Sequence, residues 1–414
     1  MVLYWCTRQP VRLALVLFGA SCLSLATTAQ ARAQPRDPAI PTEPTTVHLW
    51  GSGERPAGTL RDLDRERVWL QADRAMPARA LSWDRVRQLR GPRDAEAQPF
   101  LDDARRLWRA RARLERGDPF NAEPLFDDLA ETYPAVEGPT SGVVWEGVLR
   151  CRLRRGAHAA SIGPWLRLLR AGALDSNARF TGLSPLTGAA SRLVPALPPL
   201  WIPGPVAAAH AASEPPAVDP VASRAEREAA AMALLYHAAA AHASGDAVSS
   251  RSLNRRLEGA PDSDDLLLVR DMVFALVGML EEQEAARDRL AVRAPRPGQP
   301  SRDDWQSAWA LAALGLSRLE AGDVNIRERG VLALIRVRVE HAADMPYLAG
   351  LALAHAAAAH ANEGDREAAG RLARDLAREF THHPGLRWKP ITNLLDSATD
   401  GPADARPTDT EDAA

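Results

Sequence analysis

One segment of the chain occurs twice, and this repetition limits the possible folds more than any other feature of the sequence. The two copies read HAAAAHASGD at residues 237–246 and HAAAAHANEGD at residues 355–365. Each copy joins a run of alanines, the residue with the best helix propensity, to a glycine of the kind that ends helices. Further Gly turns follow helical stretches at Gly117, Gly156 and Gly322. The sequence therefore predicts a series of helical hairpins.

The unit around Gly117 is the most specific of these hairpins. Its pattern consists of Ala110 in the first helix, then Gly117-Asp118, Ala122, Phe126, Leu129, Tyr133 and Pro134. This pattern resembles the tetratricopeptide repeat, in which glycine opens the turn, small residues let the two helices touch, and proline stops the second helix. The resemblance extends over residues 100–172 and 223–385. It implies an α-solenoid of helical hairpins whose concave groove binds peptides or proteins.

The spacing of the turns departs from the regular family. Gly117 and Gly156 are 39 residues apart, and Gly322 and Gly364 are 42 apart, whereas the regular repeat has 34 residues. Two interpretations of the repeats therefore remain open: divergent tetratricopeptide-like units, or hairpins of a related α-solenoid. The helical blocks are predicted at residues 97–172 and 223–385. Residues 386–414 form a C-terminal segment with an acidic, disordered tail.

Residues 45–92 have the alternation of strands instead. Short runs such as Val47–Trp50, Val68–Leu70 and Val86–Leu89 are separated by Gly, Pro and Asp, which predicts a small β module, either an SH3-like barrel or a short antiparallel sheet. Trp50, Trp69 and Trp83 are expected in its core, with a binding platform as the alternative.

The first residues have the order of a secretory signal peptide. Arg8 and Arg12 precede the mostly apolar run Leu13–Ala26, and Ala29-Gln30-Ala31 fits a cleavage site. The run is shorter than the roughly 20 residues that span a bilayer. We therefore expect a signal peptide at residues 1–31, a linker at 32–44, and a periplasmic or extracellular mature protein without a membrane span. A lipoprotein with its lipid on Cys22 is the alternative.

Residues 173–222 are rich in proline and lack a helical period. They include the apolar segment Leu197–Pro203, which reads LPPLWIP. A linker between the two helical blocks is one interpretation. The other is a segment that docks into a groove of this chain or of a partner.

Several kinds of chemistry lack their motifs here. The single lysine, Lys389, excludes a phosphate-binding P-loop, and no G-x-S-x-G, H-E-x-x-H or paired C-x-x-C occurs. His237 and His242 are five residues apart, as are His355 and His360, which puts them about 140° apart on a helix rather than on one face. We expect no metal and no cofactor. A formal net charge of −2 disfavours nucleic-acid binding.

Three arginines are the candidate binding residues. Arg111 and Arg150 each lie six residues before a turn glycine, and Arg154 follows Arg150 by one helical turn. In the family resemblance this row faces the groove. Grouped positive charges need an anion, so the row implies either internal carboxylates or an external acidic peptide.

The function expected from these features is that of a non-enzymatic interaction or scaffold protein of the cell envelope. Its peptide or protein partner is expected in the tetratricopeptide-like groove; the oligomeric state is left open. One alternative is an envelope enzyme, of the cell-wall hydrolase type, with an acidic site that matches no motif. Another is a structural component of a secreted assembly.

Overall fold

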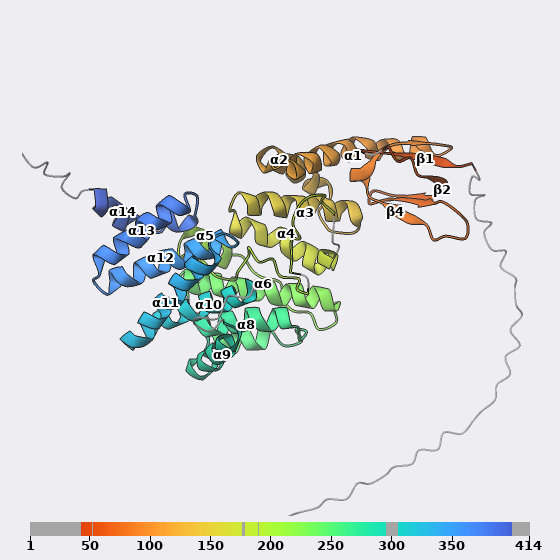
Figure 1. Cartoon of the computed structure of the whole chain (residues 1–414). Helices are drawn as coiled ribbons and strands as arrows, with labels where there is room; N and C mark the ends of the chain where they lie inside the picture. Colours follow the sequence, from red (N-terminus) through yellow and green to blue (C-terminus); the bar gives the residue numbers. More distant parts are fainter. Residues whose placement is uncertain (1–42, 52, 176–178, 189, 295–304, 400–414) are drawn as a thin grey trace, which may run out of the picture. The chain divides into compact units, whose positions relative to one another are not determined.

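The computed structural model describes residues 43–51, 53–175, 179–188, 190–294 and 305–399. The predicted signal peptide with its cleavage site and Cys22 lies outside these residues, as do residues 400–414 of the predicted acidic tail and nearly all of the predicted linker at 32–44. Within the described ranges, no helix has the length and apolar character to span a membrane. The chain is mainly helical with one small sheet (Figure 1), so the predicted fold class is confirmed at that level.

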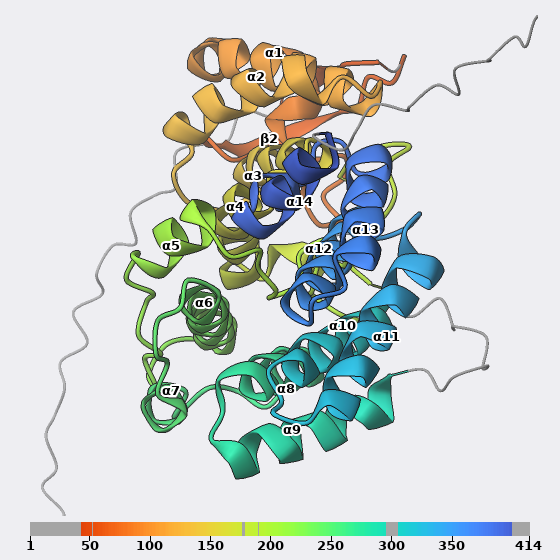
Figure 2. The same ribbon diagram turned by 90° about the vertical axis from the view of Figure 1, so that its left-hand side faces the viewer.

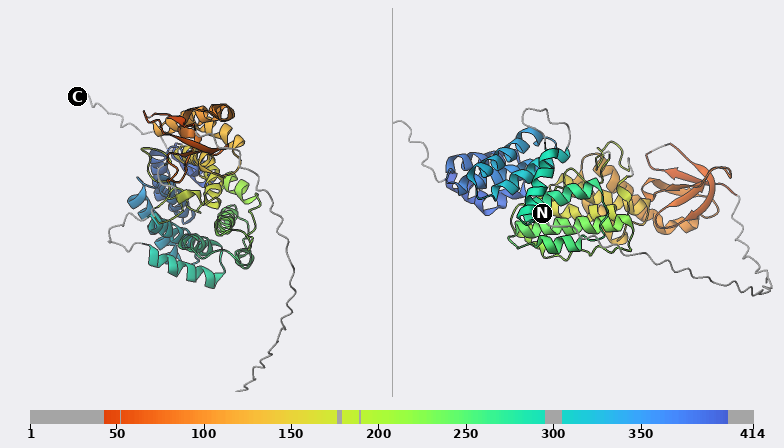
Figure 3. Two further views of the ribbon diagram at one scale, coloured as in Figure 1. Left: turned by 90° about the vertical axis from the view of Figure 1, so that its right-hand side faces the viewer. Right: turned by 90° about the horizontal axis from the view of Figure 1, so that it is seen from below.

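The N-terminal part is a five-stranded antiparallel sheet. Its strands are β1 (Thr45–Leu49), β2 (Ala57–Leu63), β3 (Val68–Gln71), β4 (Arg79–Leu81) and β5 (Val86–Arg90). The order across the sheet is β4-β3-β2-β1-β5, with Val47 opposite Leu89 and Leu60 opposite Leu70. Figure 3 shows the sheet from two further sides. The antiparallel sheet expected at residues 45–92 is thus present; the SH3-like barrel stays a prediction.

Alternation of side chains gives this sheet its own core. Every second residue points inward, so that Val47, Leu60, Val68 and Leu81 are buried. The short helix η1 (Trp83–Arg85) places Trp83 in the centre of this core with no exposed surface. Its indole Nε1 donates to the carbonyl of Asp64 at 2.8 Å.

The first helical block contains four helices. They are α1 (Asp94–Glu115), α2 (Pro119–Thr132), α3 (Pro139–Arg154) and α4 (His158–Arg170). Helix α1 begins three residues before the predicted block, and each helix packs on the next one in the chain. Gly117 and Gly156 join α1 to α2 and α3 to α4 with φ values of +82° and +72°, a conformation that favours glycine.

Close packing within the first block follows the residues that carry the family resemblance. Ala110, Ala122, Phe126 and Leu129 have no exposed surface. Phe126 lies so close to Gly147 of α3 that a Cβ atom there would overlap its ring. Small residues therefore set the distance between α2 and α3.

The Pro-rich segment, for which the sequence shows no helical period, contains two short helices, η2 (Ala173–Asp175) and α5 (Pro205–Ala211). The helices that follow it are α6 (Arg224–Ala243), α7 (Ser250–Arg256), α8 (Asp264–Val277), α9 (Leu280–Arg293), α10 (Trp305–Leu319), α11 (Val324–His341), α12 (Pro346–Asn362), α13 (Arg366–Glu379), η3 (Pro384–Arg387) and α14 (Lys389–Thr399). Figure 2 shows α10 to α13 as neighbours, and each of these packs on the next. Gly322 and Gly364 lie in the turns after α10 and α12.

The apolar part of the Pro-rich segment is buried among these helices. Leu197, Leu200 and Trp201 are 0%, 1% and 5% exposed. The hydroxyl of Tyr347 on α12 donates to the carbonyl of Leu200 at 3.0 Å, and Tyr236 on α6 donates to that of Leu197. Proline has no N–H group, so the prolines of this segment cannot donate hydrogen bonds to main-chain carbonyls. The tyrosine hydroxyls of the neighbouring helices donate to these carbonyls instead.

Candidate functional site

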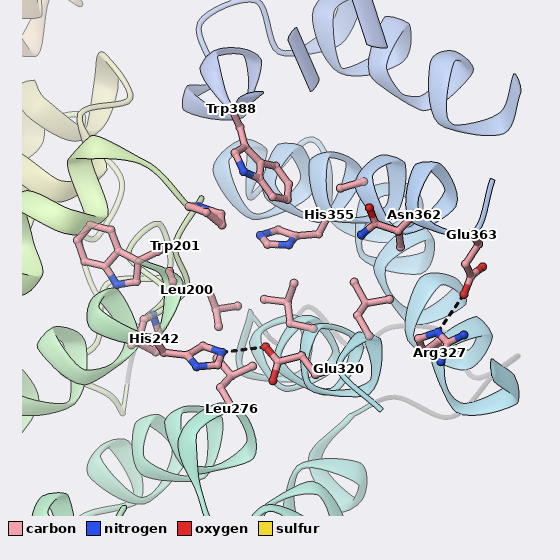
Figure 4. A pocket seen from close by; sticks show the side chains of 18 residues that line it. Leu200, Trp201, His242, Leu276, Glu320, Arg327, His355, Asn362, Glu363 and Trp388 are labelled. Atoms are coloured by element: carbon pink, nitrogen blue, oxygen red, sulfur yellow. Dashed lines mark hydrogen bonds and ion pairs between the residues drawn. The ribbon is translucent and has the colours of Figure 1, made fainter. Parts of the chain in front are cut away.

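A pocket of about 330 Å³ lies in the second helical block. Its walls come from α6, α10 and α12, and residues 199–203 of the Pro-rich segment and Trp388 close its sides (Figure 4). This volume is near the lower end of the roughly 300–1,000 Å³ typical of ligand sites. It suits one side chain or one small molecule.

Alanines of the repeated segment form much of the wall. Ala239 and Ala243 of α6 face the pocket on one side, and Ala358 and Ala359 of α12 on the other. Leu276, Leu316 and Leu319 complete the apolar surface. Because an alanine side chain ends at Cβ, helices that carry it on facing surfaces either approach closely or leave a hollow. Here they leave a hollow.

Two polar pairs lie at the rim of the pocket. The Nε2 atom of His242 lies 2.9 Å from a carboxylate oxygen of Glu320, and Arg327 donates from Nε to Glu363 at 3.1 Å. Arg327 also donates to the carbonyls of Ala321 and Gly322 at 3.1 and 2.9 Å. The guanidinium is therefore fixed to the turn after α10.

His355 lies inside the pocket. Figure 4 shows its imidazole between Trp388 and the His242–Glu320 pair, and the rings of His355 and Trp388 are 4.8 Å apart. Burial lowers the pKa of His355 to about 4, so that the imidazole is neutral at neutral pH. Its Nε2 atom is buried and has no hydrogen-bond partner among the described residues. The imidazole also has a main-chain hydrogen bond to Trp201, which ties α12 to the Pro-rich segment.

The arginines predicted from the sequence lie elsewhere, in the first block. Arg111 and Arg150 are neighbours, since both guanidiniums lie over the ring of Phe180, at 5.8 and 5.4 Å from its centroid. Arg111 pairs with the buried Asp84 and with Glu115.

The other two arginines have partners within the chain as well. Arg150 pairs with Glu146 at 2.8 Å and donates to the carbonyl of Ser184 at 3.0 Å. Arg154 is exposed and donates to the carbonyl of Leu114 at 3.4 Å. Internal carboxylates thus compensate Arg111 and Arg150, which is one of the two alternatives that the sequence left open. An external acidic ligand for the row stays a prediction.

The repeated histidines have separate environments. His242 and His355 line the pocket, whereas the Nδ1 atom of His360 lies 3.7 Å from a carboxylate oxygen of Asp365. In the described ranges, no three His, Cys, Asp or Glu side chains come together in a way that could hold a metal ion.

Comparisons with known proteins identify no relative of this chain. No protein-family model, curated protein or solved structure matches this chain.

Sequence reasoning did not select the residues of this pocket. Glu320, Arg327 and Trp388 follow no motif, and Trp201 is marked in the sequence only as part of the Pro-rich segment. The one available signal is the repeated segment itself, because Ala239, His242, His355 and Ala358 all belong to its two copies. The repetition indicates helical hairpins and does not indicate a pocket.

Proposed function

We propose that this chain is a non-enzymatic binding protein of the cell envelope that holds a segment of a partner protein in the pocket between α6, α10 and α12. The observation that carries the proposal is the composition of this pocket. Its wall is apolar and its rim is polar, with charged groups tied to each other. This combination is typical of a recognition site.

Further support comes from the helical hairpins. Successive hairpins with small residues at their contacts are consistent with a tetratricopeptide-like solenoid, an architecture that serves peptide and protein recognition. Export to the envelope is proposed from the order of charge, apolar run and cleavage pattern in the first 31 residues. The segment held by the pocket is proposed to be extended, because the hollow is too small for a folded element.

Filling the pocket tests this function. Ala359→Phe adds a ring to the pocket wall, while Ala361→Phe adds the same ring two residues further along α12, outside the pocket lining. Both tagged variants are compared with the wild type in capture from envelope extract, after circular dichroism has shown equal helix content. We expect Ala359→Phe to lose a partner that the wild type and Ala361→Phe both retain.

The opposite pattern would refute the proposal. If both variants capture the same proteins as the wild type, the pocket does not hold the partner. A wild-type protein that converts an envelope polymer without retaining a partner would instead indicate an enzyme.

A further inference from the structure

The pocket has an electrostatic preference that goes beyond its apolar wall. Glu320 lies at the rim with its side chain 48% exposed. Within the described residues its partner is the imidazole of His242 rather than a guanidinium. Arg327, a cation at the rim, donates hydrogen bonds to Glu363 and to two main-chain carbonyls. Glu320 is therefore the rim carboxylate that lacks a permanent cation.

Three helix ends strengthen the same preference. Ala243, Leu319 and Asn362 are the last residues of α6, α10 and α12, and all three line the pocket. The C-terminus of a helix has a partial charge of roughly −0.5. Three such ends around one hollow favour a positive group in it and disfavour a carboxylate.

The inner surface suits the rest of a long basic side chain. The aliphatic stem of arginine or lysine would lie against Leu316, Leu319 and the alanines. The indole of Trp388 offers its aromatic surface to a cation.

We infer that the pocket receives a single basic side chain, arginine or lysine, from an extended segment of a partner protein, with Glu320 as its charged contact. This inference rests on the proposed function, since it names the chemistry of the segment held there. The positive head displaces His242 from Glu320, and the stem fills the space between α6 and α12. An acidic segment would bring a negative charge against Glu320 and three helix ends.

Short peptides can measure this preference with the full mature protein. The probes are three fluorescein-labelled peptides of sequence Ala-Leu-X-Leu-Ala, in which X is arginine, norleucine or glutamate. Norleucine keeps an unbranched aliphatic stem and lacks the charge. We expect the arginine peptide to bind about tenfold more tightly than the norleucine peptide in fluorescence anisotropy, and the glutamate peptide to bind more weakly still.

Glu320→Gln then assigns the contact. We expect about tenfold weaker binding of the arginine peptide to this variant and unchanged binding of the norleucine peptide. Glu340→Gln is the matched control, because Glu340 lies on α11 outside the pocket lining and pairs with Arg336 at 3.1 Å. It should bind all three peptides as the wild type does.

Several results would overturn the inference. Equal affinity of the wild type for arginine and norleucine peptides would remove the charge preference, and equal weakening of both by Glu320→Gln would make Glu320 a structural residue. Competition by free agmatine at concentrations as low as those of the peptide would assign the pocket to a small amine instead. If no peptide binds, the inference fails, while the proposed function is judged separately by capture with Ala359→Phe.

Discussion

Two buried histidines should make the stability of this protein fall between pH 7 and pH 5. His158 and His383 are only 7% and 8% exposed. The ring of His158 stacks on that of Tyr347 at 4.1 Å, and its Nε2 atom lies 3.0 Å from the carbonyl of Pro198. His383 has its Nε2 atom 3.0 Å from the carbonyl of Tyr347 and accepts from the N–H of Gly385 at Nδ1. Both rings fit these partners in the neutral form.

The magnitude follows from the pKa values of the two groups. Burial lowers the pKa of His158 from 6.5 to about 3 and that of His383 from 6.5 to about 4. Below pH 6.5 the unfolded chain therefore binds protons that the folded chain does not, and stability decreases as the pH falls towards 4. Between pH 7 and pH 5 each histidine should lower the free energy of unfolding by about 2 kcal/mol, or about 4 kcal/mol together.

Urea unfolding at pH 7 and pH 5 measures this effect. His383→Gln removes one titrating group, and His382→Gln is the matched control, since His382 is exposed and adjacent in sequence. The quantity compared is the loss of stability between the two pH values, so a uniform destabilisation by either variant cancels. We expect the loss in His383→Gln to be about 2 kcal/mol smaller than in the wild type. Identical losses in His383→Gln, His382→Gln and the wild type would refute the reasoning.

Two further substitutions test the packing and the charges of the first block in the same assay at pH 7. Gly147→Ala should lower the free energy of unfolding by about 1–3 kcal/mol, because its methyl group would overlap the ring of Phe126. The control is Gly163→Ala, which should cause no loss of stability, because a Cβ atom there meets only the flexible tip of Arg167 at 3.4 Å; equal effects of the two substitutions would contradict this packing. Arg111→Ala should lower the free energy of unfolding by about 3–5 kcal/mol, because it leaves Asp84 buried without its cation. A loss below about 1 kcal/mol, typical of an exposed pair, would show that the Arg111–Asp84 pair contributes little to stability.

The elements that the sequence predicts well are those with local causes. The strands around Val47 and Val68 follow from a two-residue alternation, and the turns at Gly117 and Gly156 follow from the conformational freedom of glycine. In each case the residues that determine the structure are adjacent in the sequence. No knowledge of the remaining chain is needed.

The arginine row shows where local reasoning ends. The spacing from two turn glycines puts Arg111 and Arg150 at equivalent positions, and in the structure both guanidiniums lie over the ring of Phe180. Some of their partners are local, since Glu115 and Glu146 lie four residues away on the same helices. Others come from distant segments: Asp84 belongs to the β module, and Ser184 belongs to the Pro-rich segment. The sequence could state that carboxylates or a ligand must compensate these charges. It could not choose between them, because helix periodicity brings Glu115 and Glu146 into reach but does not reveal Asp84, which lies 27 residues from Arg111 and is brought to it by the fold.

The pocket could not be predicted for a different reason: the same alanines that favour helix packing also line a hollow. The alanines of the two repeated segments do favour helices and close packing, and Ala240 and Ala357 are fully buried. Ala239 and Ala359, on the same helices, line the hollow instead. Whether an alanine closes a contact or leaves a space depends on the separation of α6 from α12, and the Pro-rich segment is hydrogen-bonded to both helices, through Tyr236 and Tyr347. Trp201 and Leu200 hold this segment in the core through contacts that no periodicity encodes. A site formed in this way has no sequence motif. Small alanine side chains give the hollow its shape, and the irregular Pro-rich segment gives it its position.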